Sequence, residues 1–161
     1  MSTWESATGR HATGAEYYAK KGWHILPVHG ITLDGRCTCG KPHNDPKEIG
    51  KHPASPAGQR DATTDLEQIQ KWWLENPDYN VGVFCKPSGF FAIDIDPRSG
   101  GDDSFEILEA RAEGALPPTV EAQTGEYTVR GKVVRGRHLI YKCDPNEKFI
   151  GNLEKAGLKG I

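Results

Sequence analysis

The sequence predicts an α+β domain built on an antiparallel sheet with helices on one face. Segments that resemble strands outnumber those that resemble helices, and neighbouring strands are joined by short turns. The 161 residues can bury a core, and 36% hydrophobic and 26% charged residues are typical of a globular chain. Residues 1–11 are expected to form a flexible leader, and residues 12–161 the domain.

The first part of the domain is expected to form a small α/β unit. A helix is predicted over residues 12–21, where Gly22 is placed to end it, and a strand over residues 23–28. Residues 29–62 show little periodicity and are rich in Gly, Pro, Cys, His and Lys. A loop of this length is uncommon without a function or a crosslink, so about 30–60 is expected to be an inserted module.

A second helix is predicted to begin at Thr64. The sequence Thr64-Asp65-Leu66-Glu67 has the capping-box pattern, with Thr at the N-cap and Glu three residues later. Trp72 and Trp73 continue the apolar side of this helix and are interpreted as core residues. Asn76-Pro77 is placed to end the helix.

The second part of the domain is expected to supply most of the sheet. Two apolar strands are joined by Lys86-Pro87-Ser88-Gly89, a sequence typical of a hairpin turn. A helix follows, and two further strands flank a basic hairpin over residues 126–136. The predicted ranges are 80–85 and 90–95 for the first strands, 103–113 for the helix, and 120–124 and 137–142 for the last strands.

Asp94 and Asp96 lie at alternate positions of the strand that ends at Pro97. Side chains of a strand alternate between its faces, so both carboxylates are expected on one face. Two like charges at this spacing are unfavourable unless a cation lies between them. Carboxylate oxygens are preferred ligands of the divalent ions Mg²⁺ and Mn²⁺, which bind nucleotide phosphates. The alternative is a strand end in solvent, where Asp96-Pro97 opens a turn.

Arg137 and His138 begin another predicted strand. Because His138 alternates with Leu139, it could share the open face of the sheet with the two aspartates. A histidine and an arginine beside a carboxylate-bound metal would suit a triphosphate, since cationic side chains hold the remaining phosphate charge. The alternative is a half-buried histidine with a satisfied hydrogen bond at the start of a strand.

Cys37, Cys39, His43 and His52 lie in the long unpatterned loop and together make a complete ligand set for zinc. Two thiolates and two imidazoles match tetrahedral structural zinc, and a bound ion would explain how such a loop stays ordered. His29 is a candidate substitute ligand. The alternative is two free thiols at the surface with unrelated histidines.

The predicted hairpin carries four basic residues, Arg130, Lys132, Arg135 and Arg137. A ribbon with these charges on one face could follow a nucleic-acid backbone, and a solvated hairpin is the alternative. The net charge of −2 argues against a wholly basic protein that coats nucleic acid.

The sequence is expected to belong to a cytoplasmic protein with no membrane partner. No apolar run approaches the roughly 18 residues of a membrane span, and the N-terminus lacks the pattern of a signal peptide. In a reducing compartment the four cysteines are expected to be thiols or metal ligands rather than disulfides.

Several short motifs occur in a characteristic order. They are Gly22-Trp23-His24-Ile25-Leu26-Pro27, Gly50-Lys51-His52-Pro53, Asp61-Ala62-Thr63-Thr64-Asp65, Asn80-Val81-Gly82-Val83, Ile93-Asp94-Ile95-Asp96, Thr124-Gly125 and Gly136-Arg137-His138-Leu139. This order resembles the bifunctional DNA primase/polymerase (prim-pol) domain of plasmid and phage replication proteins, within the archaeo-eukaryotic primase superfamily. The resemblance covers roughly residues 12–161.

The resemblance implies an RRM-like antiparallel catalytic sheet and an N-terminal α/β unit with a zinc-binding loop insertion. Asp94 and Asp96 match the family's metal-binding acidic pair, which would hold Mg²⁺ or Mn²⁺. His138, with Arg137 beside it, matches the motif that contacts the phosphates of the incoming nucleotide, and Lys51 is a further candidate nucleotide contact.

The resemblance therefore implies a metal-dependent, DNA-directed nucleotidyltransferase that transfers nucleotides from NTP or dNTP to a primer on a DNA template and releases pyrophosphate. Its partners would be template and primer DNA, nucleoside triphosphates and a replicative helicase domain or protein, and the chain is expected to be a monomer. Two rival hypotheses are a non-catalytic module that binds nucleotide or nucleic acid and a metal-dependent nuclease.

The chain departs from the family pattern in two places. The segment between Thr124-Gly125 and Gly136 is longer than the usual short link, which makes the basic hairpin an elaboration. The third carboxylate of the family typically follows a pair such as Gly160-Ile161, where this sequence ends. The domain is therefore expected either to be a C-terminally incomplete fragment or to lack one metal ligand.

Overall fold

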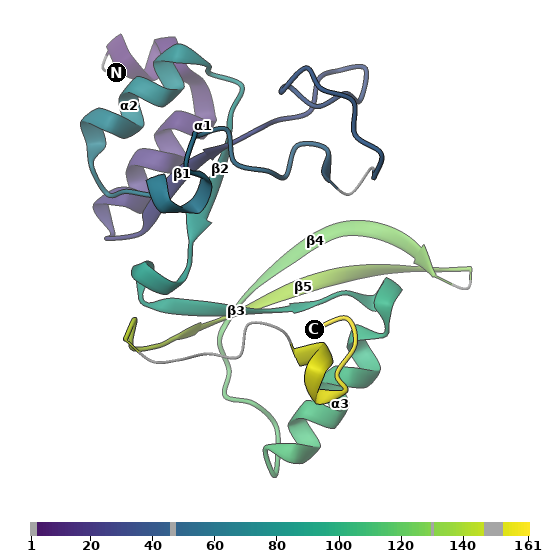
Figure 1. The fold of residues 1–161 in the computed structure, drawn as a ribbon. Coiled ribbons are helices and arrows are strands. Elements are labelled where there is room, and N and C mark those ends of the chain that lie inside the picture. Colours follow the sequence, from purple (N-terminus) through teal and green to yellow (C-terminus); the bar gives the residue numbers. More distant parts are fainter. Residues whose placement is uncertain (1–2, 46–47, 130, 147–152) are drawn as a thin grey trace. The chain divides into compact units, whose positions relative to one another are not determined.

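The computed structural model has the predicted α+β composition, with three α-helices and five strands in antiparallel pairs among the residues described. It divides into two compact units, Met1–Ser88 and Gly89–Ile161 (Figure 1). The boundary falls within the segment that we expected to be a hairpin turn. The structure describes residues 3–45, 48–129, 131–146 and 153–161.

The first unit packs two helices against a two-stranded antiparallel sheet. Its elements are α1 (Thr3–Lys20), β1 (His24–Val28), α2 (Leu66–Glu75) and β2 (Asn80–Phe84). Alanines of α1 pack on Ile25 of β1 and on Ile69 and Trp73 of α2. Trp73 is fully buried, and its indole N–H donates to the carbonyl of Tyr79 at 3.0 Å. The core interpretation of this tryptophan is therefore confirmed.

The helices of the first unit differ from the predictions at their N-termini. The backbone of α1 is helical from Thr3, with a non-helical break at Gly9 (φ 72°, ψ −169°), so helix replaces much of the expected leader. The N-cap of α2 is Asp65 rather than Thr64, because the Asp65 carboxylate accepts a hydrogen bond from the amide of Glu67 at 3.0 Å.

The second unit contains a three-stranded antiparallel sheet in the order β3-β5-β4. Its elements are β3 (Phe90–Ile95), α3 (Gly101–Arg111), β4 (Val120–Val129) and β5 (Lys132–Lys142). The predicted hairpin between residues 80–85 and 90–95 is wrong, because β2 pairs with β1 and β3 pairs with β5. Lys86–Ser88 instead forms a short 3₁₀ turn at the end of the first unit.

The basic hairpin is a continuation of the sheet rather than a separate turn. β4 and β5 pair from Val120↔Ile140 to Val129↔Lys132, with an irregularity between Gln123 and Glu126. Both strands are therefore longer than predicted. The ribbon gains backbone hydrogen bonds along this length, which the sequence pattern alone did not reveal.

Helix α3 covers one face of the three-stranded sheet (Figure 1). Phe105 of α3 forms a core with Ile95 of β3 and Leu139 of β5, and Ile95 is fully buried. Residues that alternate with this apolar set, including Asp94 and His138, must leave the sheet on its other face.

The last described residues pack against the end of β3 and the start of α3. The amide of Asp96 donates to the carbonyl of Gly160 at 2.8 Å, and the hydroxyl of Ser104 donates to the carbonyl of Lys159 at 2.7 Å. Leu158 is only 1% exposed. The segment 158–161 is therefore part of the packed second unit.

No helix in the described part of the chain is both long enough and apolar enough to cross a lipid bilayer.

The variant Gly101→Ala is expected to destabilise the second unit. A Cβ at this position would lie 2.6 Å from both the amide nitrogen of Asp96 and the carbonyl oxygen of Gly160. Backbone atoms cannot yield without disturbing the Asp96–Gly160 hydrogen bond, so the free energy of unfolding should fall by about 1–3 kcal/mol. Urea denaturation followed by circular dichroism, with hydrogen exchange at β3 amides, measures this loss.

Gly14→Ala is the matched control for this experiment. A Cβ at residue 14 of α1 meets no atom within 4 Å, and alanine is favoured over glycine inside helices. The control should keep or raise stability. Unchanged stability of Gly101→Ala would contradict the close packing of the C-terminal segment.

Candidate functional site

Asp94 and His138 face each other across neighbouring strands on the sheet face opposite α3. The register of β3 and β5 pairs the two residues directly, and His138 Nε2 lies 3.3 Å from Asp94 Oδ1. Their side chains are 69% exposed for Asp94 and 43% exposed for His138. The structure thus brings together two of the residues predicted for the open face, and a ligand can reach both.

Asp96 follows β3 directly, and its carboxylate binds Arg98. Oδ1 accepts from the backbone amide and from Nε of Arg98 at 3.0 and 2.9 Å, and Oδ2 accepts from Nη2 at 2.9 Å. Asp96 also caps the 3₁₀ turn Pro97–Ser99, so the turn given as the alternative interpretation is present. A metal ion at Asp96 would have to compete with the Arg98 guanidinium.

Arg137 lies on the face of the sheet that α3 covers, which separates it from His138. Its guanidinium carbon is 4.9 Å from the centre of the Phe105 ring, and Nη1 is 4.0 Å from Oε2 of Glu121. Adjacent residues of a strand point to opposite faces, so Arg137 and His138 lie on opposite faces of the sheet. Their shared contact with a nucleotide stays a prediction.

The basic residues of the β4–β5 ribbon differ in their surroundings. The Arg135 guanidinium donates to the Glu126 carboxylate and to the side-chain oxygen of Gln123. Lys132 is exposed at the end of the hairpin. Arg130 lies outside the described residues. Two acidic residues of β4, Glu121 and Glu126, therefore offset part of the positive charge that the sequence suggested.

Lys51, the remaining candidate nucleotide contact, belongs to the first unit. It is exposed, and its backbone amide donates to the carbonyl of Glu48 at 3.3 Å. It directly precedes His52, one of the predicted zinc ligands.

The four predicted zinc ligands converge in the long loop. One ligand atom from each of Cys37, Cys39, His43 and His52 lies within 4.8 Å of the others, and no other such group of three or more appears among the described residues. The Sγ of Cys39 is 3.1 Å from Nε2 of His43. Two thiols and two imidazoles at this separation can hold a metal such as zinc, as the sequence predicted.

Hydrogen bonds lower the pKa of the Cys37 thiol, which favours the thiolate form that binds metal. Burial raises the pKa of the Cys37 thiol, but the backbone amides of Cys39 and Gly50, with the side chains of Cys39 and His43, outweigh it and lower the pKa to about 7. Cys37 is 5% exposed. A buried, readily ionised thiol fits a structural metal site better than a free surface thiol does.

Hydrogen bonds hold the loop that carries the four predicted zinc ligands against the rest of the first unit. Thr38 exchanges bonds with Gly30: its amide donates to the Gly30 carbonyl at 3.0 Å, and its hydroxyl accepts from the Gly30 amide at 2.9 Å. Asn80 of β2 donates its side-chain amide to the carbonyls of His29 and Gly50 at 3.3 and 3.5 Å. The loop is therefore anchored at both of its ends.

His29 lies beside the cluster without joining it. Its Nδ1 is 3.3 Å from the hydroxyl of Thr38. Burial, followed by the charges of His52, His43 and Lys41, lowers the pKa of His29 and favours its neutral form. The structure therefore selects His52 over His29 as the fourth member of the cluster.

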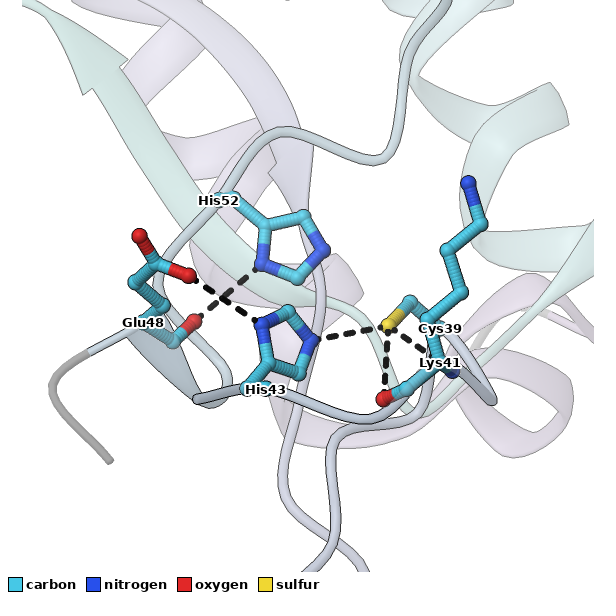
Figure 2. A network of polar contacts seen from close by, with 5 residues as sticks. All are labelled: Cys39, Lys41, His43, Glu48 and His52. Atoms are coloured by element: carbon cyan, nitrogen blue, oxygen red, sulfur yellow. Dashed lines mark hydrogen bonds and ion pairs between the residues drawn. The ribbon is translucent and has the colours of Figure 1, made fainter. Parts of the chain in front are cut away.

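Three contacts around the cluster were not predicted from the sequence. Glu48 bonds to both histidines, and the amide of Lys41 donates to Sγ of Cys39 at 3.4 Å (Figure 2). A single acidic residue between two histidines is too common to be a signal, and a backbone amide leaves no trace in sequence. Only the folded loop shows these contacts.

Zinc removal is expected to disorder the loop while the helical core of the first unit remains. Protein purified without chelator should contain about one zinc per chain, and Cys39→Ser should lower this content strongly, because the site loses a thiolate. Elemental analysis measures zinc, and hydrogen exchange reports loop order after chelation.

Cys143→Ser serves as the control, since Cys143 is a half-buried free thiol outside the cluster. Its zinc content should equal that of the wild type. Metal-free wild-type protein, or equal zinc in Cys39→Ser, would rule out this site.

The chain matches the family described as "Bifunctional DNA primase/polymerase, N-terminal" over residues 15–161. Comparison with curated proteins and with solved structures gives no match. The matched segment contains the Asp94–His138 pair and the whole Cys/His cluster. The order of motifs and the family match agree, and the chain belongs to the bifunctional DNA primase/polymerase N-terminal family.

Proposed function

We propose that this chain is the primase/polymerase domain of a phage or plasmid-type replication protein. It transfers nucleotides from NTP or dNTP to a primer on a DNA template, with template, primer and nucleotide as partners. Membership of the family implies primase/polymerase activity. The observation that carries the proposal is the accessible Asp94–His138 pair on the sheet face opposite α3.

The second unit supports an RRM-like catalytic sheet. Its antiparallel strands carry a helix on one face and the polar pair on the other. The open face of this sheet is proposed to support a nucleotide and a primer end, while α3 forms the core on the other face. The zinc-binding insertion and the α/β elements of the first unit complete the proposed architecture.

The carboxylates suit Mg²⁺ or Mn²⁺ in chemical type, since both ions prefer oxygen ligands. Asp94 is accessible as it stands, and Asp96 follows β3 with an extended backbone (φ −102°, ψ 104°). When bound, such an ion activates the 3′-hydroxyl and stabilises the pyrophosphate leaving group. Among the described residues no third metal-ligating side chain joins these two in a cluster.

In this proposal each candidate residue has a distinct role. Asp94 and Asp96 hold the metal, and His138 contacts the triphosphate from the neighbouring strand. Arg137 supports the sheet from the α3 face, where it stacks on Phe105. Lys51 is retained as a nucleotide contact on its motif alone.

A second candidate is a module that binds nucleotide or nucleic acid without catalysis. The engagement of Asp96 by Arg98 favours it, because one of the two carboxylates is then unavailable to a metal. A replicative helicase, fused or separate, is the proposed partner of either form, and the chain is proposed to act as a monomer.

Template-directed incorporation of labelled nucleotides tests the catalytic proposal. The double variant Asp94→Ala, Asp96→Ala should lose incorporation by at least about 10³-fold, because the charge that holds the metal is removed. Glu106→Gln is the control, since Glu106 is an exposed carboxylate of α3, the helix on the other face of the sheet.

Activity that survives in the double variant would overturn the assignment of the two aspartates. Binding of primer-template without incorporation, even with Mn²⁺, would select the non-catalytic module. Cleavage of single-stranded DNA without nucleoside triphosphate would select a nuclease.

The β4–β5 ribbon is proposed to contact the DNA backbone through Arg130, Lys132 and Arg135. Lys132→Gln should weaken DNA binding more than Arg135→Gln, because Arg135 already donates to Glu126 and Gln123. Each lost phosphate contact should reduce the salt slope of binding by about 1. Fluorescence anisotropy at several salt concentrations measures this slope.

Lys71→Gln on α2 is the control for a general change of charge, because Lys71 is exposed on a helix of the first unit. Its binding should match that of the wild type. Wild-type affinity and slope in both ribbon variants would remove the ribbon from the DNA interface.

A further inference from the structure

Glu48 contacts both histidines of the Cys/His cluster through the same ring atom of each. Its carboxylate oxygen Oε2 lies 3.5 Å from Nδ1 of His43, and its backbone carbonyl lies 3.2 Å from Nδ1 of His52. Figure 2 shows the two imidazoles on one side of Glu48, with the remaining ring nitrogen of each directed away from it. Glu48 thus contacts the two histidines with two different oxygen atoms, one from its side chain and one from its backbone.

These contacts determine which nitrogen of each ring can bind a metal. The carboxylate oxygen Oε2 and the backbone carbonyl oxygen of Glu48 both accept hydrogen bonds. The proton of each neutral imidazole therefore belongs on Nδ1. The lone pair then remains on Nε2. In His43 this Nε2 lies 3.1 Å from Sγ of Cys39, on the side where the ligand atoms converge.

The carbonyl of Glu48 is held in place independently of its side chain. It accepts from the amide of Lys51 at 3.3 Å, and the amide of Glu48 donates to the carbonyl of Asp45 at 3.1 Å. A turn of the backbone therefore aims this carbonyl at His52. The carboxylate, by contrast, is 65% exposed and reaches His43, whose side chain is 13% exposed.

We infer that Glu48 is the positioning residue of the metal centre, where it holds His43 and His52 in the tautomer that presents Nε2 to the ion. This role rests on the proposed zinc site, not on nucleotidyl transfer. Carboxylate or carbonyl partners on the second nitrogen of a ligating histidine fix the ring and raise its basicity. Glu48 supplies both kinds of partner.

The exposed carboxylate of Glu48 should contribute little to the stability of the metal-free protein. A surface contact between an exposed carboxylate and an imidazole is weak, since water screens it. A bound cation draws electron density from the ring and makes its N–H a stronger donor to Glu48. The effect of Glu48 should therefore be seen in metal affinity rather than in the stability of the apoprotein.

Zinc affinity is measured by competition with a chromophoric chelator, and the visible absorption of the Co²⁺-loaded protein reports ligand geometry. Glu48→Ala should bind zinc about 10- to 100-fold more weakly and should alter the Co²⁺ bands. Glu48→Gln should recover part of this loss, because its side-chain oxygen can still accept from His43 Nδ1. The thermal midpoint of the apoprotein should be the same in all three proteins.

Asp34→Asn is the matched control, since it removes one carboxylate charge from the same loop. Asp34 bonds to Arg36 at 2.6 Å and belongs to no part of the cluster. Its zinc affinity should equal that of the wild type. Unchanged affinity in Glu48→Ala, equal losses in Asp34→Asn, or an apoprotein destabilised by Glu48→Ala would each overturn the role of Glu48.

The outcomes separate this role from the other proposals. A wild-type protein that binds no zinc would refute the metal site and, with it, Glu48 as its positioning residue. Loss of nucleotide incorporation in the aspartate variants leaves the zinc titration unaffected, because that titration needs no catalysis.

Discussion

The pairing of β3 with β5 is the interaction on which the second unit and its candidate active site depend. This register places Asp94 opposite His138 on one face, while Ile95 and Leu139 meet Phe105 of α3 on the other. A slip of one residue would turn the carboxylate into the apolar core and the isoleucine into solvent. Burial of the apolar face therefore fixes the register that places Asp94 beside His138, and no further interaction is needed to align the two residues.

The same alternation limits what the basic residues can do. Arg137 lies beside His138 in sequence but on the other face, where it stacks on Phe105 and approaches Glu121. Arg135 is likewise engaged by an acidic residue of the paired strand. Positive charge on the ribbon is thus shared between structural contacts and any contact with DNA, which leaves the exposed Lys132 as its most available cation in the described part of the ribbon.

The long loop of the first unit depends on polar contacts rather than on a core. Backbone bonds between Thr38 and Gly30, side-chain bonds from Asn80 and the convergence of the four ligand residues hold it in one conformation. A bound metal would add covalent-like links at the point where apolar burial is scarce. In the role inferred for it, Glu48 orients the two histidine ligands and does not itself bind the ion.

The sequence by itself determined the α+β class, the buried Trp73, the ligand set of the Cys/His cluster and the position of Asp94 and His138 on strands, because period, composition and motif order are local properties. It could not determine strand pairing: Lys86-Pro87-Ser88-Gly89 has the sequence of a hairpin turn, although β2 and β3 belong to different sheets. It also could not show that Arg137 faces α3, that Arg98 occupies Asp96, or that Glu48 serves both histidines. Those outcomes were decided by tertiary structure, since each depends on which distant segments pack together and which face of an element they cover.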